Sequence, residues 1–358
     1  MNKLDIFDVG HGDSMLFTVD DQNLYPLLID TGKKKDQIYK RINCEKFNIM
    51  ITHQDLDHMG GIEELFKYKS NQIRKIYIPL YIPEIIKIFS RIILMGKNNM
   101  STINNINSMI LNNLSKINFV YEGYNKDYGY ELGRYNEILN PPLKDFDHFQ
   151  KKDFKKFTYE KAIEVLNEMD IFSDNFVYDY IPEYTEGLSE ELISSKIKYY
   201  KYIVRAIAFN FKNKKNISKK VKANRLNKLF TISSNDISII LKYEEDFSIL
   251  FTGDAGDKVI NKLIYKQLVK NIDVLKIPHH GGKNSVEKNI LKTLKPSYGI
   301  LSHGNRKFNR GSVPTNTTIS ELIKNNVNIL ATNNFSTNIY KQKGRVSHNI
   351  KGLDIHFK

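Results

Sequence analysis

Residues 52–61 read Thr-His-Gln-Asp-Leu-Asp-His-Met-Gly-Gly and contain four metal-capable side chains within six residues. It directly follows residues 47–51, an apolar run with the character of a short strand that ends in a tight turn. Imidazole and carboxylate groups, both present here, are ligands that divalent transition metals accept when the site must also bind water. The stretch therefore predicts a metal-binding loop at the end of a strand. The alternative is a solvated acidic loop with two surface histidines.

The spacing of the four ligand groups predicts two ions. The side chains stand at offsets 0, 2, 4 and 5, so they cannot all point into one ion. His53 and Asp55 are predicted to bind one ion, and Asp57 and His58 the other. Asp57 is also predicted to orient or deprotonate a water molecule that the metal ions activate as a nucleophile.

The loop resembles the His-x-His-x-Asp-His motif of the metallo-β-lactamase superfamily, in a variant with Asp55 at the third position. The variant followed by Met-Gly-Gly is similar to the nuclease domain of ComEC-type competence proteins and their stand-alone hydrolase relatives. The resemblance implies an α/β (α+β) fold, a four-layer αβ/βα sandwich. In it two mixed sheets lie face to face, with helices outside and the metals at one edge.

Two earlier segments also resemble this family. Residues 4–17 resemble its Asp-Val-Gly-Gln-Gly-Asp opening, with His11 where glutamine is usual. The resemblance places His11 and Asp13 at the rim of the metal cleft, although a purely structural hairpin turn is the alternative. Residues 27–32 match the first motif, in which Asp30 supports the metal loop through hydrogen bonds and does not bind metal itself.

Two later segments supply further ligands. A strand ends in Thr-Gly-Asp at Asp254, which is predicted to bridge both ions because one carboxylate can give an oxygen to each. Residues 273–282 resemble the Leu-Lys-x-Pro-His-His-Gly signature of the ComEC-type group. There His279 is predicted as a metal ligand and His280 as a neighbouring ligand or proton-transfer group, and the reverse assignment stays open.

The sequence departs from the family at two points. The histidine of the family's third motif is absent. Asn235 or Asp236 is a weak substitute for it as a metal ligand. The ion bound by His53 and Asp55 is therefore predicted to have too few ligands. The late His-Pro pair reads Val-Pro, which leaves His303 as the candidate that protonates the leaving group. The basic residues predicted to bind phosphate beside it are Arg306, Lys307 and Arg310.

The family resemblance covers residues 1–81 and 229–358, which are predicted to form one domain. Residues 82–228 are predicted to be a long, mostly helical insertion that is basic in its second half. Its run from Leu192 to Ser234 contains no acid and interleaves Lys and Arg with Tyr and Phe. That pattern favours a nucleic-acid groove, and the alternative is a solvated lysine face with tyrosines in the core.

Composition indicates the kind of partner and the compartment of the protein. The net charge of +14 favours a polyanionic partner. A single cysteine, Cys44, excludes an intramolecular disulfide and a cysteine-rich zinc site, and it fits a reducing compartment. The absence of a signal-like start and of a run of about 18 apolar residues predicts a cytoplasmic protein that does not bind a membrane.

Together these features predict a metal-dependent hydrolase with two divalent ions, zinc or manganese. The predicted substrate is a phosphodiester in DNA or RNA, attacked by a metal-activated water. One alternative is a hydrolase of a small ester, a lactone or a phosphocholine-type group. Another is a catalytically impaired subunit that binds nucleic acid or, through the insertion, a partner protein.

Overall fold

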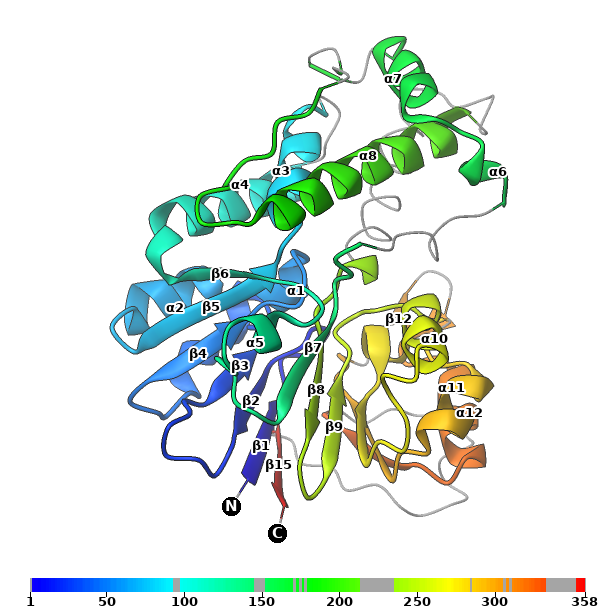
Figure 1. Ribbon diagram of the computed structural model, residues 1–358. Coiled ribbons are helices and arrows are strands. Elements are labelled where there is room, and N and C mark those ends of the chain that lie inside the picture. Colours follow the sequence, from blue (N-terminus) through cyan, green and yellow to red (C-terminus); the bar gives the residue numbers. More distant parts are fainter. Residues whose placement is uncertain are drawn as a thin grey trace. The chain divides into compact units, whose positions relative to one another are not determined.

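The computed structural model describes residues 2–92, 97–144, 152–169, 172–173, 176, 179–212, 235–283, 285–304, 307–308, 311–332 and 352–357. The chain forms two compact units (Figure 1). The first contains Met1–Pro79, Ser115–Pro141 and Asn235–Lys358. The second contains Leu80–Leu114 and Pro142–Ser234.

The first unit contains a seven-stranded mixed sheet. Its neighbouring strands β15, β1, β2 and β3 are antiparallel, whereas β3, β4, β5 and β6 are parallel. The strands β3 and β4 are almost wholly buried, as their apolar sequences predict. In sheet order the strands are β15 (Gly352–Phe357), β1 (Asn2–Phe7), β2 (Met15–Thr18), β3 (Leu27–Ile29), β4 (Phe47–Met50), β5 (Ile73–Pro79) and β6 (Ile117–Val120).

A second, six-stranded mixed sheet belongs to the same unit. Its strands β14, β11, β10 and β9 are parallel, and β8 and β7 continue the sheet in antiparallel fashion. In sheet order the strands are β14 (Asn328–Ala331), β11 (Tyr298–Leu301), β10 (Val274–Lys276), β9 (Ser248–Phe251), β8 (Ile240–Glu244) and β7 (Asn136–Asn140). A short hairpin, β12 (Lys307–Phe308) with β13 (Gly311–Ser312), stands apart from both sheets.

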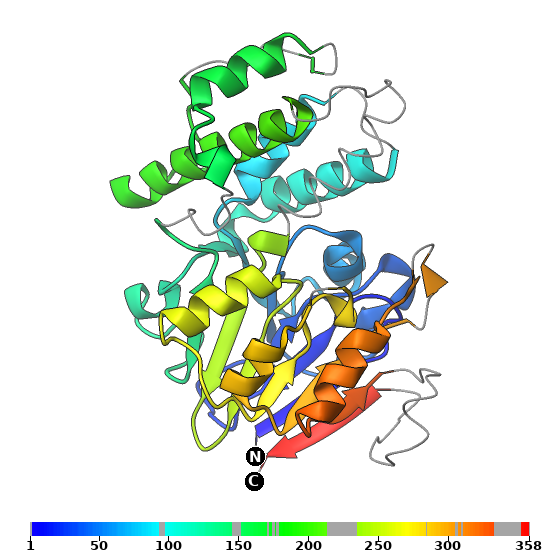
Figure 2. The same ribbon diagram turned by 90° about the vertical axis from the view of Figure 1, so that its right-hand side faces the viewer.

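The two sheets face each other across a buried core. The Phe17 ring of the first sheet contacts Tyr243 and Phe251 of the second, with ring centroids 4.9 and 5.6 Å apart. Figures 1 and 2 show helices α10 (Asp257–Tyr265), α11 (Lys288–Leu294) and α12 (Asn316–Lys324) on the outer face of the second sheet. Helix α2 (Ile62–Lys69) lies on the outer side of the first sheet (Figure 1). The predicted four-layer αβ/βα arrangement is confirmed.

The carboxyl ends of parallel strands carry the predicted motifs. Asp30 follows β3, and the loop of residues 52–55 follows β4 and leads into α1 (Leu56–Met59). In the second sheet, Asp254 follows β9, and the histidine pair follows β10 in the turn η5 (Pro278–Gly281). Since parallel strands end at one edge of a sheet, this topology gathers loops that are far apart in the sequence.

The second unit is helical. Its longest helix, α8, packs against α3 and α7. The helices are α3 (Ile82–Ser90), α4 (Lys97–Asn112), α6 (Lys152–Lys155), α7 (Tyr159–Asn167) and α8 (Glu190–Lys212). In the parts of the chain that the structure describes, none of the helices has the length and apolar character needed to cross a membrane.

Residues 115–141 fall inside the predicted insertion, but they belong to the two sheets. They contain β6 and β7, an edge strand of each sheet, joined through α5 (Tyr124–Asp127). The short apolar runs of β6 and β7 read as pieces of helix when their pairing partners are unknown. The helical unit is therefore built from two separate segments and not from the single continuous range 82–228 that was predicted as the insertion.

Helix α8 contains the described half of the acid-free run, and its aromatic side chains Tyr199, Tyr200 and Phe211 are buried, whereas Tyr202 and Phe209 are half-buried. Tyr199 stacks on Tyr81 and Tyr200 stacks on Tyr180, with ring centroids 4.1 and 3.7 Å apart. Lys196 is buried in an ion pair with Glu84, at 3.0 Å. The buried rings cannot stack on bases, so this half of the run follows the core alternative. The other half, residues 213–234, lies outside the described residues.

Candidate metal centre

The metal loop is held against the turn at residues 10–13. The Asp13 amide donates a hydrogen bond of 3.1 Å to the Asp57 carbonyl. Gly12 has φ of 156°, and a Cβ there would lie 2.4 Å from the Asp57 carbonyl oxygen. Only glycine permits this approach, because any side chain would push the two loops apart. The turn therefore fixes the backbone of the loop at Asp57.

Asp30 is the residue that orients His58. It stands directly after β3 with a φ of 58°, a left-handed conformation that aspartate tolerates. Its carboxylate accepts hydrogen bonds of 2.8 Å from both the amide and the hydroxyl of Thr52. It also accepts one of 2.7 Å from His58 Nδ1. His58 Nε2 is thereby turned toward Asp254, as a supporting carboxylate does in a metal site.

His280 is oriented by a backbone carbonyl. Both histidines of the pair have left-handed backbones, with φ of 48° at His279 and 53° at His280. Strain of this kind is tolerated where surrounding contacts impose it, and it gathers at functional sites. His280 Nδ1 donates to the Ser302 carbonyl at 3.0 Å. Its Nε2 therefore faces Asp57 Oδ2 at 3.8 Å and Asp254 Oδ2 at 3.7 Å.

Histidine and carboxylate ligand atoms gather within 4.8 Å of one another in four overlapping groups of the described residues. Asp254 belongs to two groups, one with His53 and His58 and one with Asp13 and His280. The other two groups are His11 with Asp57 and His280, and Asp13 with Asp30 and His58. Asp55 lies beside His53, with Oδ2 3.7 Å from Nε2.

The separations in these groups suit a shared cation. Two ligands of one tetrahedral ion, each about 2.1 Å from it, lie roughly 3.4 Å apart. His58 Nε2 is 3.3 Å from Asp254 Oδ1, and His53 Nε2 is 4.0 Å from Asp254 Oδ2. The buried Nε2 atoms of His53, His58 and His280 also lack a well-aligned hydrogen-bond partner among the described residues. Buried polar atoms of that kind are costly unless something binds them, so these residues fit a divalent ion.

The electrostatics of the cluster keep its carboxylates ionised. Burial raises the pKa of Asp254, but His58 and His280 outweigh burial and hold that pKa well below its usual range. Burial likewise opposes ionisation of Asp57, whose pKa is nevertheless lowered by the same two histidines. Burial lowers the pKa of His58, and the carboxylates of Asp254 and Asp30 raise it well above the ordinary value. The carboxylates are thus ionised beside protonated histidines, and a metal ion that binds here would replace the histidine protons as their counter-charge.

His279 lies beside Asn235, which belongs to none of the groups of ligand atoms. Its Nδ1 is 3.3 Å from the side-chain nitrogen of Asn235. The geometric groups include His280 and not His279, so the open reverse assignment fits the described residues better than the preferred one. Both histidines have left-handed backbone angles, and their rings are inclined at 72° with centroids 6.2 Å apart, so the two imidazoles do not face the same way. His279 still interacts electrostatically with Asp254 and His53, near the ion predicted to lack ligands.

His303, the predicted acid, is not part of the described cluster. His303 is fully buried after β11, where its amide donates to the Thr332 hydroxyl at 3.1 Å. It is absent from all four groups of ligand atoms. Arg306, Arg310 and the side chain of Lys307 lie outside the described residues.

Sequence reasoning missed the role of Lys276. Its side chain is fully buried, and its Nζ pairs with Asp13 and donates to the Gly253 carbonyl at 2.9 Å. The same Nζ lies 3.8 Å from Asp254 Oδ1. Asp13 was predicted at the rim, but it is fully buried, with Oδ2 3.8 Å from His58 Nδ1 and Oδ1 3.4 Å from His280 Nδ1. A lysine within an apolar strand motif was the available signal, since a buried ammonium requires a buried acid.

Replacing Lys276 with methionine is expected to destabilise the protein by about 3–5 kcal/mol, because Asp13 would keep a buried charge without its cation. Urea unfolding measures the effect. The matched control is Lys288→Met on the exposed start of α11, which should change stability by less than about 0.5 kcal/mol. Adding Asp13→Leu to Lys276→Met should recover much of the loss. An unfolding midpoint for Lys276→Met equal to that of the wild type would contradict the pairing.

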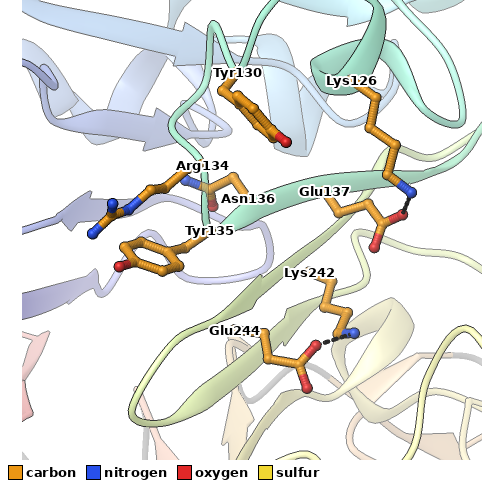
Figure 3. A pocket seen from close by; sticks show the side chains of 8 residues that line it. All are labelled: Lys126, Tyr130, Arg134, Tyr135, Asn136, Glu137, Lys242 and Glu244. Carbon is orange, nitrogen blue, oxygen red and sulfur yellow. Dashed lines mark ion pairs between the residues drawn. The ribbon is translucent and has the colours of Figure 1, made fainter.

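A surface pocket on the same unit has a different character. It lies beside β7 and β8, and Figure 3 shows Lys126 paired with Glu137 and Lys242 paired with Glu244. Each lysine thus has a carboxylate next to it, and no described metal-type group is present there. The remaining lining residues are Tyr130, Arg134, Tyr135 and Asn136. The buried cluster is the better candidate for chemistry.

Comparisons with known proteins agree with the motif resemblance. Residues of the chain are 38% identical over 66 residues to Recombination protein 2 of Haemophilus influenzae, and 32% identical over 117 residues to ComE operon protein 3 of Bacillus subtilis. These matches cover 18% and 32% of this chain but only 8% and 15% of those proteins. They confirm the resemblance to competence proteins over the matched segments. No family model matches the chain.

Two solved structures were also found to be similar. One is a diphosphatase of the PhnP family, with a TM-score of 0.37, 9% identity and coverage of 99% of this chain and 97% of that one. The other is an archaeal metallo-β-lactamase superfamily protein from Sulfolobus tokodaii. Its TM-score is 0.23 and its identity 16%, over 38% of this chain and 54% of that one.

Proposed function

We propose that this chain, which resembles the metallo-β-lactamase superfamily and its ComEC-type branch, is a metal-dependent hydrolase of phosphodiesters. The observation that carries the proposal is the buried group of His53, His58 and Asp254 together with the group of Asp57 and His280. Their ligand atoms lie at separations suited to shared cations. The loops that carry these atoms follow strands of both sheets. Two divalent ions bound there would supply a nucleophilic water at neutral pH and electrostatic stabilisation of phosphoryl oxygens.

The chain's own residues have distinct tasks in this proposal. Asp254 would face both ions, since its two oxygens point to different histidines: Oδ1 to His58 and Oδ2 to His280. His58 and His280 lower the pKa of Asp57, so its carboxylate is ionised and would accept a proton or a hydrogen bond from the attacking water. Asp30 and the Ser302 carbonyl hold the two imidazoles in place. The ammonium group of Lys276 offsets part of the negative charge of Asp13 and Asp254.

DNA or RNA is the substrate class that we propose. One matched relative is named a recombination protein, and the chain carries a net charge of +14 that favours polyanions. The buried aromatic rings of α8 give no support to stacking on unpaired bases. The proposal therefore relies on backbone phosphate contacts, which attract nucleic acid of any sequence.

A panel of substrates tests the proposal. With manganese or zinc present, the protein is expected to hydrolyse a generic phosphodiester reporter and to cleave DNA or RNA oligonucleotides, because the site suits attack on a phosphoryl group. Rates should be at least about 10-fold higher on the phosphodiester than on a lactone or carboxylic ester reporter. Turnover of the lactone or ester alone would support the small-substrate alternative. Salt-sensitive binding of oligonucleotides without turnover of any reporter would support the binding-subunit alternative.

A further inference from the structure

His11, which was predicted at the rim of the metal cleft, lies beside two of the candidate metal ligands, Asp57 and His280. Its Nε2 is 3.6 Å from Asp57 Oδ2, and its ring centroid is 4.5 Å from that of His280. His280 Nε2 in turn lies 3.8 Å from the same Asp57 oxygen. One ligand atom from each of these three residues falls within 4.8 Å of the other two.

We propose that His11 is a metal ligand, which binds one divalent ion together with Asp57 and His280. This inference rests on the metal centre of the proposed function. Its separations of 3.6 and 3.8 Å are close to the roughly 3.4 Å expected between ligands of one tetrahedral ion. Together with Asp254, whose Oδ2 lies 3.7 Å from His280 Nε2, these residues would give the ion four protein ligands, and the attacking water would be a fifth ligand.

The backbone around His11 is fixed before any ion binds. On one side, the close approach of Gly12 to the Asp57 carbonyl admits no side chain. On the other, a Cβ at Gly304 would lie 2.4 Å from the His11 amide nitrogen. The Ser302 hydroxyl also donates a 2.6 Å hydrogen bond to the Gly12 carbonyl. A ligand carried on such a turn loses little conformational entropy when it binds, so it can contribute most of its interaction energy to affinity.

The proposal gives the ion at Asp57 two imidazole ligands, His11 and His280. The group of His53, His58 and Asp254 also offers two imidazoles, so nitrogen donors suit both positions to zinc. We therefore expect loss of His11 to weaken the binding of one zinc ion and to leave the other bound.

Zinc titration of two variants tests the assignment. His11→Gln introduces an amide, a poor zinc ligand, whereas His11→Phe keeps an aromatic ring against His280 but removes the ligand atom. Both variants should lose at least about 10-fold in affinity for one zinc ion, since even residues that only support a ligand cost 10-fold or more when changed. X-ray absorption of zinc-saturated protein should report fewer imidazoles per zinc in both variants than in the wild type.

The outcomes separate this inference from the proposed function. Unchanged affinity and imidazole count in His11→Gln and His11→Phe, with the wild type binding zinc, would overturn the assignment of His11 alone. Loss of affinity in His11→Gln but not in His11→Phe would also overturn it, since ring packing would then explain the effect. A wild type that takes up no zinc, manganese or cobalt would overturn both.

Discussion

Asp57→Ala is expected to lower the rate of phosphodiester hydrolysis by more than about 100-fold while the protein stays folded. Residues that merely orient a ligand are worth about 10- to 100-fold, and Asp57 is itself a candidate ligand that also faces the attacking water. Its Oδ2 lies 3.6 Å from His11 and 3.8 Å from His280, so its loss removes the acid shared by both imidazoles. Turnover of a phosphodiester reporter at saturating metal measures the effect.

The matched control for this change is Asp246→Ala. Asp246 is an exposed aspartate in the turn between β8 and β9, far along the strands from the motif-bearing ends. It should retain wild-type turnover. Circular dichroism and metal content establish that Asp57→Ala is folded and show whether it still binds ions. If Asp57→Ala keeps near wild-type turnover with metal bound, the role assigned to this carboxylate is wrong.

Removal of metal is expected to abolish turnover and also to lower the stability of the first unit. Asp13, Asp30 and Asp254 are buried close together, and a bound cation would offset their combined charge. A ligand that binds only the folded state adds about 2.7 kcal/mol when its free concentration is 100 times its dissociation constant. Thermal unfolding after treatment with a chelator, and after titration with zinc or manganese, measures this contribution.

The control for this experiment is a variant without the central ligands, His58→Ala with Asp254→Ala. Its unfolding midpoint should respond much less to added metal than that of the wild type, because the gain depends on a site in the folded state. Turnover should return when metal is added back to the chelated wild type. Equal midpoints for the wild type with and without metal, together with turnover that survives chelation, would contradict a metal-dependent hydrolase.

The histidine pair shows where sequence reasoning stops. The motif identifies both His279 and His280 as candidates, because either can follow a buried strand into a metal cleft. Which one faces Asp57 depends on backbone angles near φ 48° and 53°, which no periodicity predicts. The tertiary contact of His280 Nδ1 with the Ser302 carbonyl then fixes the ring.

The helical unit shows the same limit. Alternating Lys and Tyr in the acid-free run are compatible with a groove and with a core, since composition does not say which face is covered. In the structure, Tyr180 and Tyr81 cover Tyr200 and Tyr199, and Glu84 neutralises Lys196. Likewise, the short strands β6 and β7 gain their stability from sheet neighbours that lie elsewhere in the sequence, so they were predicted as insertion.

The resemblance of the motifs to a known family predicted the layered α/β fold and the candidate ligands, because each motif is a local run of residues that can be read without the structure. Apolar strands end in His, Asp and Gly, and strand polarity alone brings those ends to one edge. Only the tertiary structure decided which groups meet: Asp13 with Lys276, and His11 with Asp57 and His280. These pairs are separated by tens to hundreds of residues, and a buried charge shows its partner only when the packing around both is known.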